Sequence, residues 1–239
     1  MIKNALIAAM MMGLVYAGQN EMVVTAPAPA PVSEVSPWSL ELGMGSNFGL
    51  NKAIKSDYLT KKNHINTLSW DVTGVYNLNE NHAITLRFAY GYGRDKFAVV
   101  PDYEGMTGTY REPNMHVRET IHQFSLMPGY RYTLPVADRW AVYAGANVGL
   151  SNESFKLDFH EDFDRKSSYT VSGHDTAWGF AYSVEVGAKY AITENLYAFG
   201  AATWSGTTAK TKVKFDGETV AKGNRHGYIG VRVGVGYSF

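Results

Sequence analysis

The sequence has no cysteine, no surplus charge and, after its first residues, no long apolar run. Each of these absences excludes a class of protein. Without cysteine there is no disulfide framework, no thiolate metal site and no lipidated N-terminal cysteine. The 22 Lys and Arg residues balance 22 Asp and Glu residues, so the chain lacks the basic surplus of a nucleic-acid-binding protein. After residue 17, no apolar run is long enough for the ~18 residues of a membrane-spanning helix.

The first 36 residues are expected to be a signal and a spacer. Lys3, the apolar run 5–15 and the small-residue exit at Ala17 predict a secretory signal peptide over residues 1–17. Residues 18–36 form an Ala/Pro-rich periplasmic leader. Its run 26–31 alternates Ala with Pro and should be extended, since proline cannot pair in a sheet. The sequence leaves open whether this leader binds a periplasmic partner.

Residues 37–239 show the two-residue period of β-strands. In 228–239, apolar residues at the odd positions alternate with Gly, Arg and Ser. No segment supplies a second layer, so the pattern predicts a sheet closed on itself in a membrane. We expect an all-β, eight-stranded, antiparallel up-and-down transmembrane β-barrel. The strands are predicted at 38–48, 64–76, 82–93, 119–134, 140–151, 176–190, 196–207 and 225–239.

The predicted connections alternate in length. Those at 77–81, 135–139 and 191–195 are short, whereas those at 49–63, 94–118, 152–175 and 208–224 are long and polar. This asymmetry is typical of outer-membrane barrels. We therefore expect a monomer in the bacterial outer membrane, with extracellular long loops and both mature termini in the periplasm.

Strand alternation also predicts which way each side chain faces. In 196–207 we expect Tyr197 and Phe199 to face lipid, with Ala198, Gly200 and Ala202 inside. Aromatic residues gather near both strand ends, with Tyr228 in the belt at the loop ends.

An eight-stranded barrel has an interior that side chains can fill. Acidic and basic residues at inward positions can form a nearly neutral network that plugs the lumen. Its predicted members are Glu41, Asp71, Arg87, Arg131, Glu185, Lys189 and Arg232.

The barrel region resembles the small outer-membrane barrels of the OmpA, OmpX and opacity-protein superfamily. Segments 123–132 and 140–149 and the terminal Tyr237-Ser238-Phe239 carry the resemblance. It implies an assembly signal, read by the outer-membrane assembly machinery, at Val233, Val235, Tyr237 and Phe239. Larger relatives append a peptidoglycan-binding domain, which we do not expect here.

The sequence favours no catalytic residues, metal or cofactor. None of His64, His122, His174 and His226 has both a serine and an acid placed to form a triad. The run 158–164 is rich in acids but lacks the glycine of a calcium loop. The alternation of Phe155, Leu157 and Phe159 instead predicts a strand extended above the membrane.

Loop charges suggest an anion-binding surface. Lysines dominate the first and last long loops, whereas 152–175 is acidic. Barrel closure brings the first and last loops together, so we expect lipopolysaccharide phosphates to bind there. The candidates are Lys52, Lys55, Lys61, Lys62, Lys210, Lys212, Lys214, Lys222 and Arg225. A merely solvated mixed surface is the alternative.

The expected role is structural or adhesive, carried by the long loops at the cell surface, and we expect no enzyme. A small ion or solute channel is the alternative, and a lipid-modifying enzyme is less favoured because no triad exists. The sequence does not identify the surface ligand.

Overall fold

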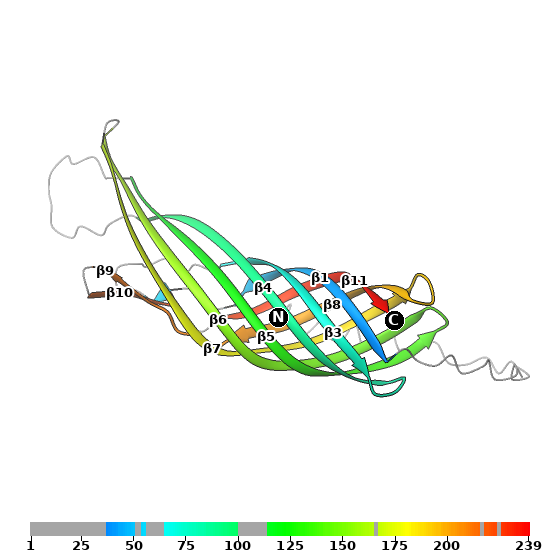
Figure 1. Ribbon diagram of the computed structural model, residues 1–239. Coiled ribbons are helices and arrows are strands. Elements are labelled where there is room, and N and C mark those ends of the chain that lie inside the picture. Colours follow the sequence, from blue (N-terminus) through cyan, green and yellow to red (C-terminus); the bar gives the residue numbers. More distant parts are fainter. Residues whose placement is uncertain are drawn as a thin grey trace, which may run out of the picture. The chain divides into compact units, whose positions relative to one another are not determined.

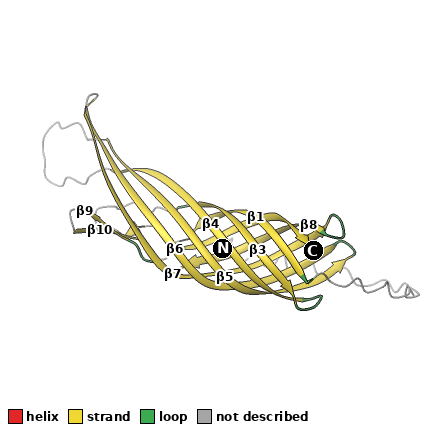
Figure 2. Ribbon diagram, viewed as in Figure 1, coloured by secondary structure: helices red, strands yellow, loops and turns green. Residues whose placement is uncertain are grey.

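The computed structural model describes residues 37–50, 54–55, 65–99, 114–164, 167–215, 218–223 and 226–239. Every regular element in these residues is a β-strand, and Figure 2 shows the strands in yellow. The predicted signal peptide (1–17) and leader (18–36) lie outside the described residues.

Eight strands close into a barrel, each antiparallel to both neighbours (Figure 1). The ring runs β1-β11-β8-β7-β6-β5-β4-β3, so the first and last strands pair and close it. The predicted eight-stranded antiparallel barrel is confirmed. The strands are β1 (Trp38–Gly49), β3 (Thr67–Asn77), β4 (His82–Val99), β5 (Asn114–Ala137), β6 (Trp140–Asp164), β7 (Ser167–Ala191), β8 (Leu196–Thr207) and β11 (Gly227–Ser238).

The outer face of the barrel is an apolar band. Along β11, Ile229, Val231 and Val233 are each about half exposed, while Gly230 and Arg232 between them are buried. In water such a surface would drive aggregation, whereas in lipid it matches its surroundings. The described residues contain no helix long and apolar enough to cross a membrane.

The two ends of the barrel differ. At the short-turn end, residues 78–81, 138–139 and 192–195 join neighbouring strands. In the first of these turns, the Asn79 side-chain oxygen accepts hydrogen bonds from the backbone N–H groups of Asn81 and His82, both at 2.9 Å. The long connections lie at the opposite end, the long-loop end.

Strands β4 to β7 continue far beyond the apolar band at the long-loop end (Figure 1). Their register runs unbroken from Arg94 opposite Thr120 to Val99 opposite Met115, and from Asn152 opposite Trp178 to Asp162 opposite Ser168. The predicted loop at 152–175 is therefore strand over most of its length, and the strand expected above the membrane at 158–164 is confirmed. In the predicted loop at 94–118, residues 94–99 and 114–118 are strand instead, and the residues between them lie outside the described part of the chain.

These residues form strands because apolar side chains continue to occupy every second, inward position above the membrane. Val117, Ile121, Phe155 and Leu157 occupy inward positions of β5 and β6, and all are fully buried. An apolar face with a two-residue period stabilises strands in water as well as in lipid. The polar residues between them misled the prediction.

A small sheet joins the first and last long connections. Its order is β2 (Ile54–Lys55), β10 (Glu218–Gly223) and β9 (Lys212–Phe215). The two lysine-rich connections thus lie side by side, in accordance with the pairing of β1 and β11.

The predicted facing of β8 is wrong. Phe199 is buried and Tyr197 reaches the lumen, whereas Ala202 and Trp204 face outward. The aromatic rings fill the space left by glycines on the neighbouring strand. Phe199 stands opposite Gly234, and Tyr197 stands opposite Gly236.

Tyr228 does not belong to an outward aromatic belt. Its side chain is buried at the long-loop end of the lumen, where its ring stacks on His226. Trp178 and Trp204 do face outward at this end. The error arises because the period of β11 makes Tyr228 an even, inward position.

We expect Gly234→Ala to lower the free energy of unfolding by about 1–3 kcal/mol, because a methyl group there would meet the Phe199 ring and the Leu42 carbonyl. Urea titration of the refolded barrel in lipid vesicles measures this. Gly200→Ala is the matched control, because its nearest neighbours would lie 4.0 Å away. Equal stability of the two variants would contradict the packing described here.

Candidate functional site

The lumen holds a buried ion-pair network, and Arg131 is its most enclosed member. From β5, Arg131 donates two hydrogen bonds to Glu41 of β1, at 2.6 and 3.0 Å. Its Nη2 also donates to Glu185 of β7 at 3.0 Å. All three side chains are at most 1 % exposed, so each charge depends on the others for compensation.

A second set of ion pairs lies on the long-loop side of Arg131. Arg232 of β11 binds Asp71 of β3 through Nε at 2.8 Å and Nη2 at 2.5 Å. Arg87 of β4 donates to Glu185 at 2.5 Å. Arg232 Nη1 lies 3.5 Å from Glu185 Oε2, which connects the two sets.

Lys189 completes the network at the short-turn end, with its Nζ 3.2 Å from Glu41 Oε1. The structure thus brings all seven predicted lumen residues into one connected cluster. They come from six strands of the ring. The alternation in each strand and the register between strands place them at neighbouring heights.

Aromatic rings enclose these cations, and the sequence interpretation missed most of that role. The Arg131 guanidinium lies 4.6 Å from the centre of the Tyr143 ring, and Arg232 lies 4.4 Å from that of Phe199. Tyr197 donates a hydrogen bond to Glu41 at 2.9 Å. The inward glycines of β11 were the available signal, because a lumen that must be filled requires large residues opposite them.

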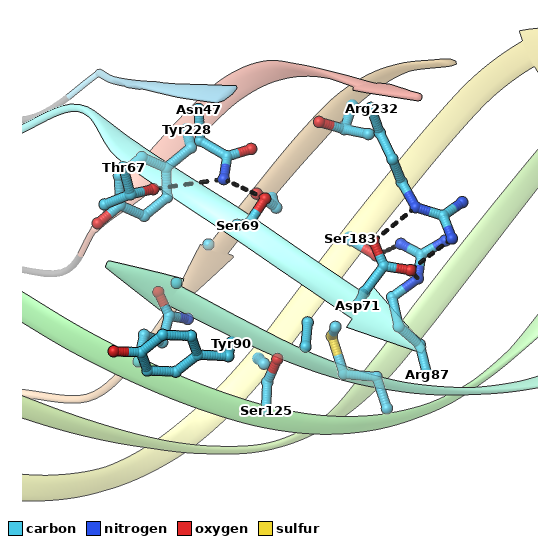
Figure 3. A pocket seen from close by; sticks show the side chains of 18 of the residues that line it. Asn47, Thr67, Ser69, Asp71, Arg87, Tyr90, Ser125, Ser183, Tyr228 and Arg232 are labelled. Carbon is cyan, nitrogen blue, oxygen red and sulfur yellow. Dashed lines mark hydrogen bonds and ion pairs between the residues drawn. The ribbon is translucent and has the colours of Figure 1, made fainter. Parts of the chain in front are cut away.

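A polar cavity of about 90 Å³ lies on the long-loop side of the network. Asp71, Arg87 and Arg232 form its floor, with both arginines directed at Asp71 (Figure 3). On its wall, Asn47 donates to Thr67 and Ser69, at 3.3 and 3.1 Å. Hydroxyl groups and this volume suit a few water molecules.

Residues 208–213, which we call the strap, continue from the end of β8 alongside β7 at the long-loop end. The Thr208 N–H donates to the Phe180 carbonyl, and the Phe180 N–H donates to the Thr208 hydroxyl, both at 2.9 Å. Farther along, the Lys212 N–H donates to the Asp175 carboxylate at 2.5 Å. These bonds hold the strap against β7. At Gly179, a side chain would collide with the strap backbone.

The strap closes an apolar cap. Ala209, Thr211 and Val213 face inward and are fully buried, while Lys210 and Lys212 between them are exposed. Strand β9, which begins in the strap, lies against β6 and β7. At this level the inward residues of β6 are large, and most of those of β7 are small. The other buried apolar side chains of the cap are Ile65, Val117, Ile121, Phe155 and Leu157.

Ionisable groups are buried inside this cap. His226, just before β11, places Nε2 3.3 Å from Glu153 Oε1 of β6, across the mouth of the barrel. Glu119 of β5 is fully buried, and neither of its carboxylate oxygens has a hydrogen-bond partner among the described residues. Burial raises the pKa of Glu119 to about 8, and Asp95 opposite it on β4 adds to the rise.

The structure describes only some of the basic residues predicted to bind anions. Lys52, Lys61, Lys62 and Arg225 lie outside the described residues. The register sets Lys222 opposite both Lys55 and Lys212. Lys210, Lys212 and Lys214 are exposed at alternate positions and therefore share one face of the strap region.

The predicted assembly-signal residues Val233, Val235, Tyr237 and Phe239 are all exposed on the outer face of the barrel. Phe239 is held at the short-turn end by a hydrogen bond from its N–H to the Trp38 carbonyl at 3.0 Å. Their role in assembly stays a prediction.

No group of three or more His, Asp or Glu side chains in the described part of the chain is arranged to hold a metal ion. His226 and Glu153 pair, but both are buried in the cap. Among the described residues this pair thus offers no exposed acid–base site for a substrate.

Solved structures with related folds are distant. Ail, the attachment invasion locus protein of Yersinia pestis, is 14% identical, with 84% of this chain and 98% of that chain covered and a TM-score of 0.39. OprG from Pseudomonas aeruginosa is 15% identical over 84% and 95% of the two chains, with a TM-score of 0.44. The Escherichia coli outer membrane protease OmpT is 11% identical over 86% and 98%, with a TM-score of 0.42. Similarities this low assign no function to this chain.

A search of curated proteins gives no match. The model of the outer membrane protein beta-barrel domain, however, matches residues 22–239. This range contains the whole closed ring of strands. The chain therefore belongs to the outer membrane β-barrel protein family and is a protein of the bacterial outer membrane.

Proposed function

We propose that this protein is a surface-interaction barrel that binds its partners through the long-loop end. In this proposal the long-loop end is extracellular and the short-turn end faces the periplasm. The observation that carries the proposal is the strand extension, meaning the parts of β4 to β7 that continue beyond the apolar band.

The strand extension is a rigid platform rather than a set of irregular loops. Strands β5, β6 and β7 have 24, 25 and 25 residues, against 12 in β1 and β11. A tilted transmembrane strand needs only ~9–11 residues, so more than half of each long strand is not required for crossing the membrane. Binding residues on such a scaffold are held in place before the partner arrives.

Among the described residues, one side of the strand extension presents an unpaired edge. The pairing of β3 with β4 ends at Gly93 opposite Thr67, and no described strand pairs with β4 beyond that point. An open strand edge offers backbone donors and acceptors to an extended peptide. We infer that an extended segment of another surface protein is the kind of partner that this edge suits.

The lumen supports this role over the channel alternative. The ion-pair network fills the barrel at one level, and the apolar cap covers it at another. The 90 Å³ cavity between these levels is polar, but an ion would have to break several buried ion pairs to pass. A lumen filled in this way favours a function carried by the outer surfaces.

Lipopolysaccharide is the proposed partner of the lysine face. The strap runs beside β7, anchored at Phe180 and Asp175, so Lys210 falls beside Trp178. Trp178 is 73% exposed on the outer face, at the end of the apolar band. In this arrangement the Trp178 ring would lie among the acyl chains of the lipid. The lysines just above it would contact the phosphate groups of the headgroup.

The in-register lysines support the same proposal. Lys55, Lys222 and Lys212 occupy directly opposed positions on three neighbouring strands. Like charges placed opposite each other destabilise a sheet, and a bound anion would relieve that cost.

Shortening the strand extension tests the surface-interaction proposal. We expect a variant in which an Asn-Gly turn replaces residues 95–119, between the opposed Arg94 and Thr120, to lose most cell-surface binding. The measurement is adhesion of bacteria displaying the protein to an epithelial monolayer, with a loss of at least tenfold expected. Arg94→Gln/Lys96→Gln, which keeps the edge, is the control. Full adhesion by the shortened, folded barrel would refute the proposal.

Removing two lysines tests the lipopolysaccharide proposal. We expect Lys210→Gln/Lys212→Gln to weaken binding of purified lipopolysaccharide by roughly tenfold to thirtyfold at low salt, at about 1 kcal/mol per lysine. The difference should shrink as salt is added. The control is Lys96→Gln/Lys156→Gln, which removes two exposed lysines elsewhere. Competition by inorganic phosphate distinguishes a general anion site from one specific for the lipid. Equal affinities of the two double variants would exclude the site.

Removing Arg131 and its two ion pairs tests whether the lumen network stabilises the barrel. We expect Arg131→Ala to lower the free energy of unfolding by about 3–5 kcal/mol, because Glu41 and Glu185 would lose a buried partner. Arg139→Ala, at an exposed short turn, should change it by less than about 0.5 kcal/mol. Urea titration in lipid vesicles compares them, and a loss below 1 kcal/mol for Arg131→Ala would show that the network contributes little.

A further inference from the structure

The lumen network contains more positive than negative charge. Its four cations contact three carboxylates, and every member except Lys189 has a side chain that is at most 5% exposed. Sharing gives each cation a partner, but it leaves one positive charge in excess. An excess charge inside a membrane barrel is costly, because neither lipid nor packed side chains solvate it. It therefore requires contact with water or a counterion.

The two ends of the network differ in their access to water. At the short-turn end, the Lys189 side chain is 17% exposed, so water partly solvates its ammonium group. At the other end, the guanidinium groups of Arg87 and Arg232 are 5% exposed and border the polar cavity. Of the two carboxylates beside them, only Asp71 serves them alone, because Glu185 also binds a third arginine. Any further compensation at this end must come from the cavity.

The wall of the cavity offers hydrogen-bond donors. Ser183 accepts a hydrogen bond from Arg87 at 3.4 Å, and Asn47 donates to both Thr67 and Ser69. A hydroxyl group that accepts in this way still has one proton to donate. No group in the described part of the chain accepts a hydrogen bond from these three hydroxyls. Their protons are therefore available to a ligand in the cavity.

The positive charge and the hydroxyl groups lie around one space. Figure 3 shows Arg87, Arg232 and Asp71 grouped at one end of the cavity, with Thr67 and Ser69 at the other. Both oxygens of Asp71 already accept hydrogen bonds from Arg232, at 2.8 and 2.5 Å. Two arginines beside a single engaged carboxylate leave this end of the cavity positive.

Volume and charge define the class of ligand. The cavity of about 90 Å³ is several times the ~10–15 Å³ that one enclosed water molecule requires. A halide ion together with water molecules therefore has room. One excess positive charge matches a monovalent anion, whereas a divalent anion would make the network negative. Guanidinium and hydroxyl groups form charge-assisted hydrogen bonds with such ions.

We propose that the polar cavity binds one small monovalent anion of the halide or nitrate class, which compensates the excess positive charge of the lumen network. Arg87 and Arg232 supply the attraction, and the hydroxyl groups of Ser69 and Ser183 donate hydrogen bonds to the ion. Binding stabilises the folded barrel, because the unfolded chain has no such site. The proposal concerns the lumen and is independent of the surface-interaction proposal.

The dependence of stability on bromide tests the proposal. The barrel, refolded in lipid vesicles, is unfolded with urea while sodium bromide replaces sodium gluconate, whose anion is much larger, at constant ionic strength. A site with a Kd of about 10 mM would lower the unfolding equilibrium constant roughly tenfold at about 100 mM bromide. We expect a fall of this size that levels off as the site fills. A change of less than twofold, or one that never saturates, would overturn the proposal.

Matched serine variants locate the site. Ser69→Ala/Ser183→Ala removes two donors from the cavity wall, and we expect it to reduce the bromide effect from tenfold to less than threefold. The control Ser39→Ala/Ser238→Ala removes a pair of hydroxyl groups, 3.0 Å apart, at the short-turn end and should keep the full effect. Equal bromide effects in the two double variants would show that the cavity is not the site.

Charge variants distinguish the two ends of the network. Arg87→Gln removes a positive charge beside the cavity, and Lys189→Gln removes one at the short-turn end. We expect the bromide effect to disappear in the first variant and to persist in the second. The reverse result would place the excess charge at Lys189 and refute the cavity site.

Anomalous diffraction gives a direct check on the unsubstituted protein. In crystals of the barrel grown with bromide, we expect an anomalous peak inside the cavity, in contact with an arginine of its floor and with Ser183. Bromide peaks confined to the protein surface would overturn the proposal.

Discussion

The constraint on which this fold depends is that lipid offers no hydrogen bonds to a peptide backbone. Every strand that crosses the membrane must find a partner on both sides, and the pairing of β1 with β11 satisfies the last pair of edges. Closure with eight strands then fixes a narrow interior. That interior excludes most water, so any charge within it requires a partner of opposite sign.

The lumen meets this requirement by sharing partners. Glu41 interacts with Arg131, Lys189 and Arg232, while Glu185 interacts with three arginines. Sharing lets three carboxylates compensate four cations, and aromatic rings cover the faces of the guanidinium groups. The glycines of β11 belong to the same arrangement, because they admit the rings of Tyr197 and Phe199.

The barrel was predictable because few other folds fit eight segments in which apolar residues recur at every second position and which are joined by alternately short and long connections. The lumen charges were predictable for the same reason, since alternation assigns each to the interior. The facing of β8 was not, because Tyr197 and Phe199 are as apolar as lipid-facing residues and their role depends on the glycines of a distant segment. The strand extension was predicted only at 158–164 and was otherwise taken as loop, because its polar outer residues resemble loop sequence. The buried position of His226 depends on Glu153, which lies 73 residues earlier in the sequence and is brought near only by closure.

The strap shows how a loop segment can serve two environments at once. Its inward residues Ala209, Thr211 and Val213 are fully buried, and its outward lysines are exposed and carry the proposed lipid-binding face. A strand with alternating residues couples these two faces, because a shift that frees the inner side must also move the lysines.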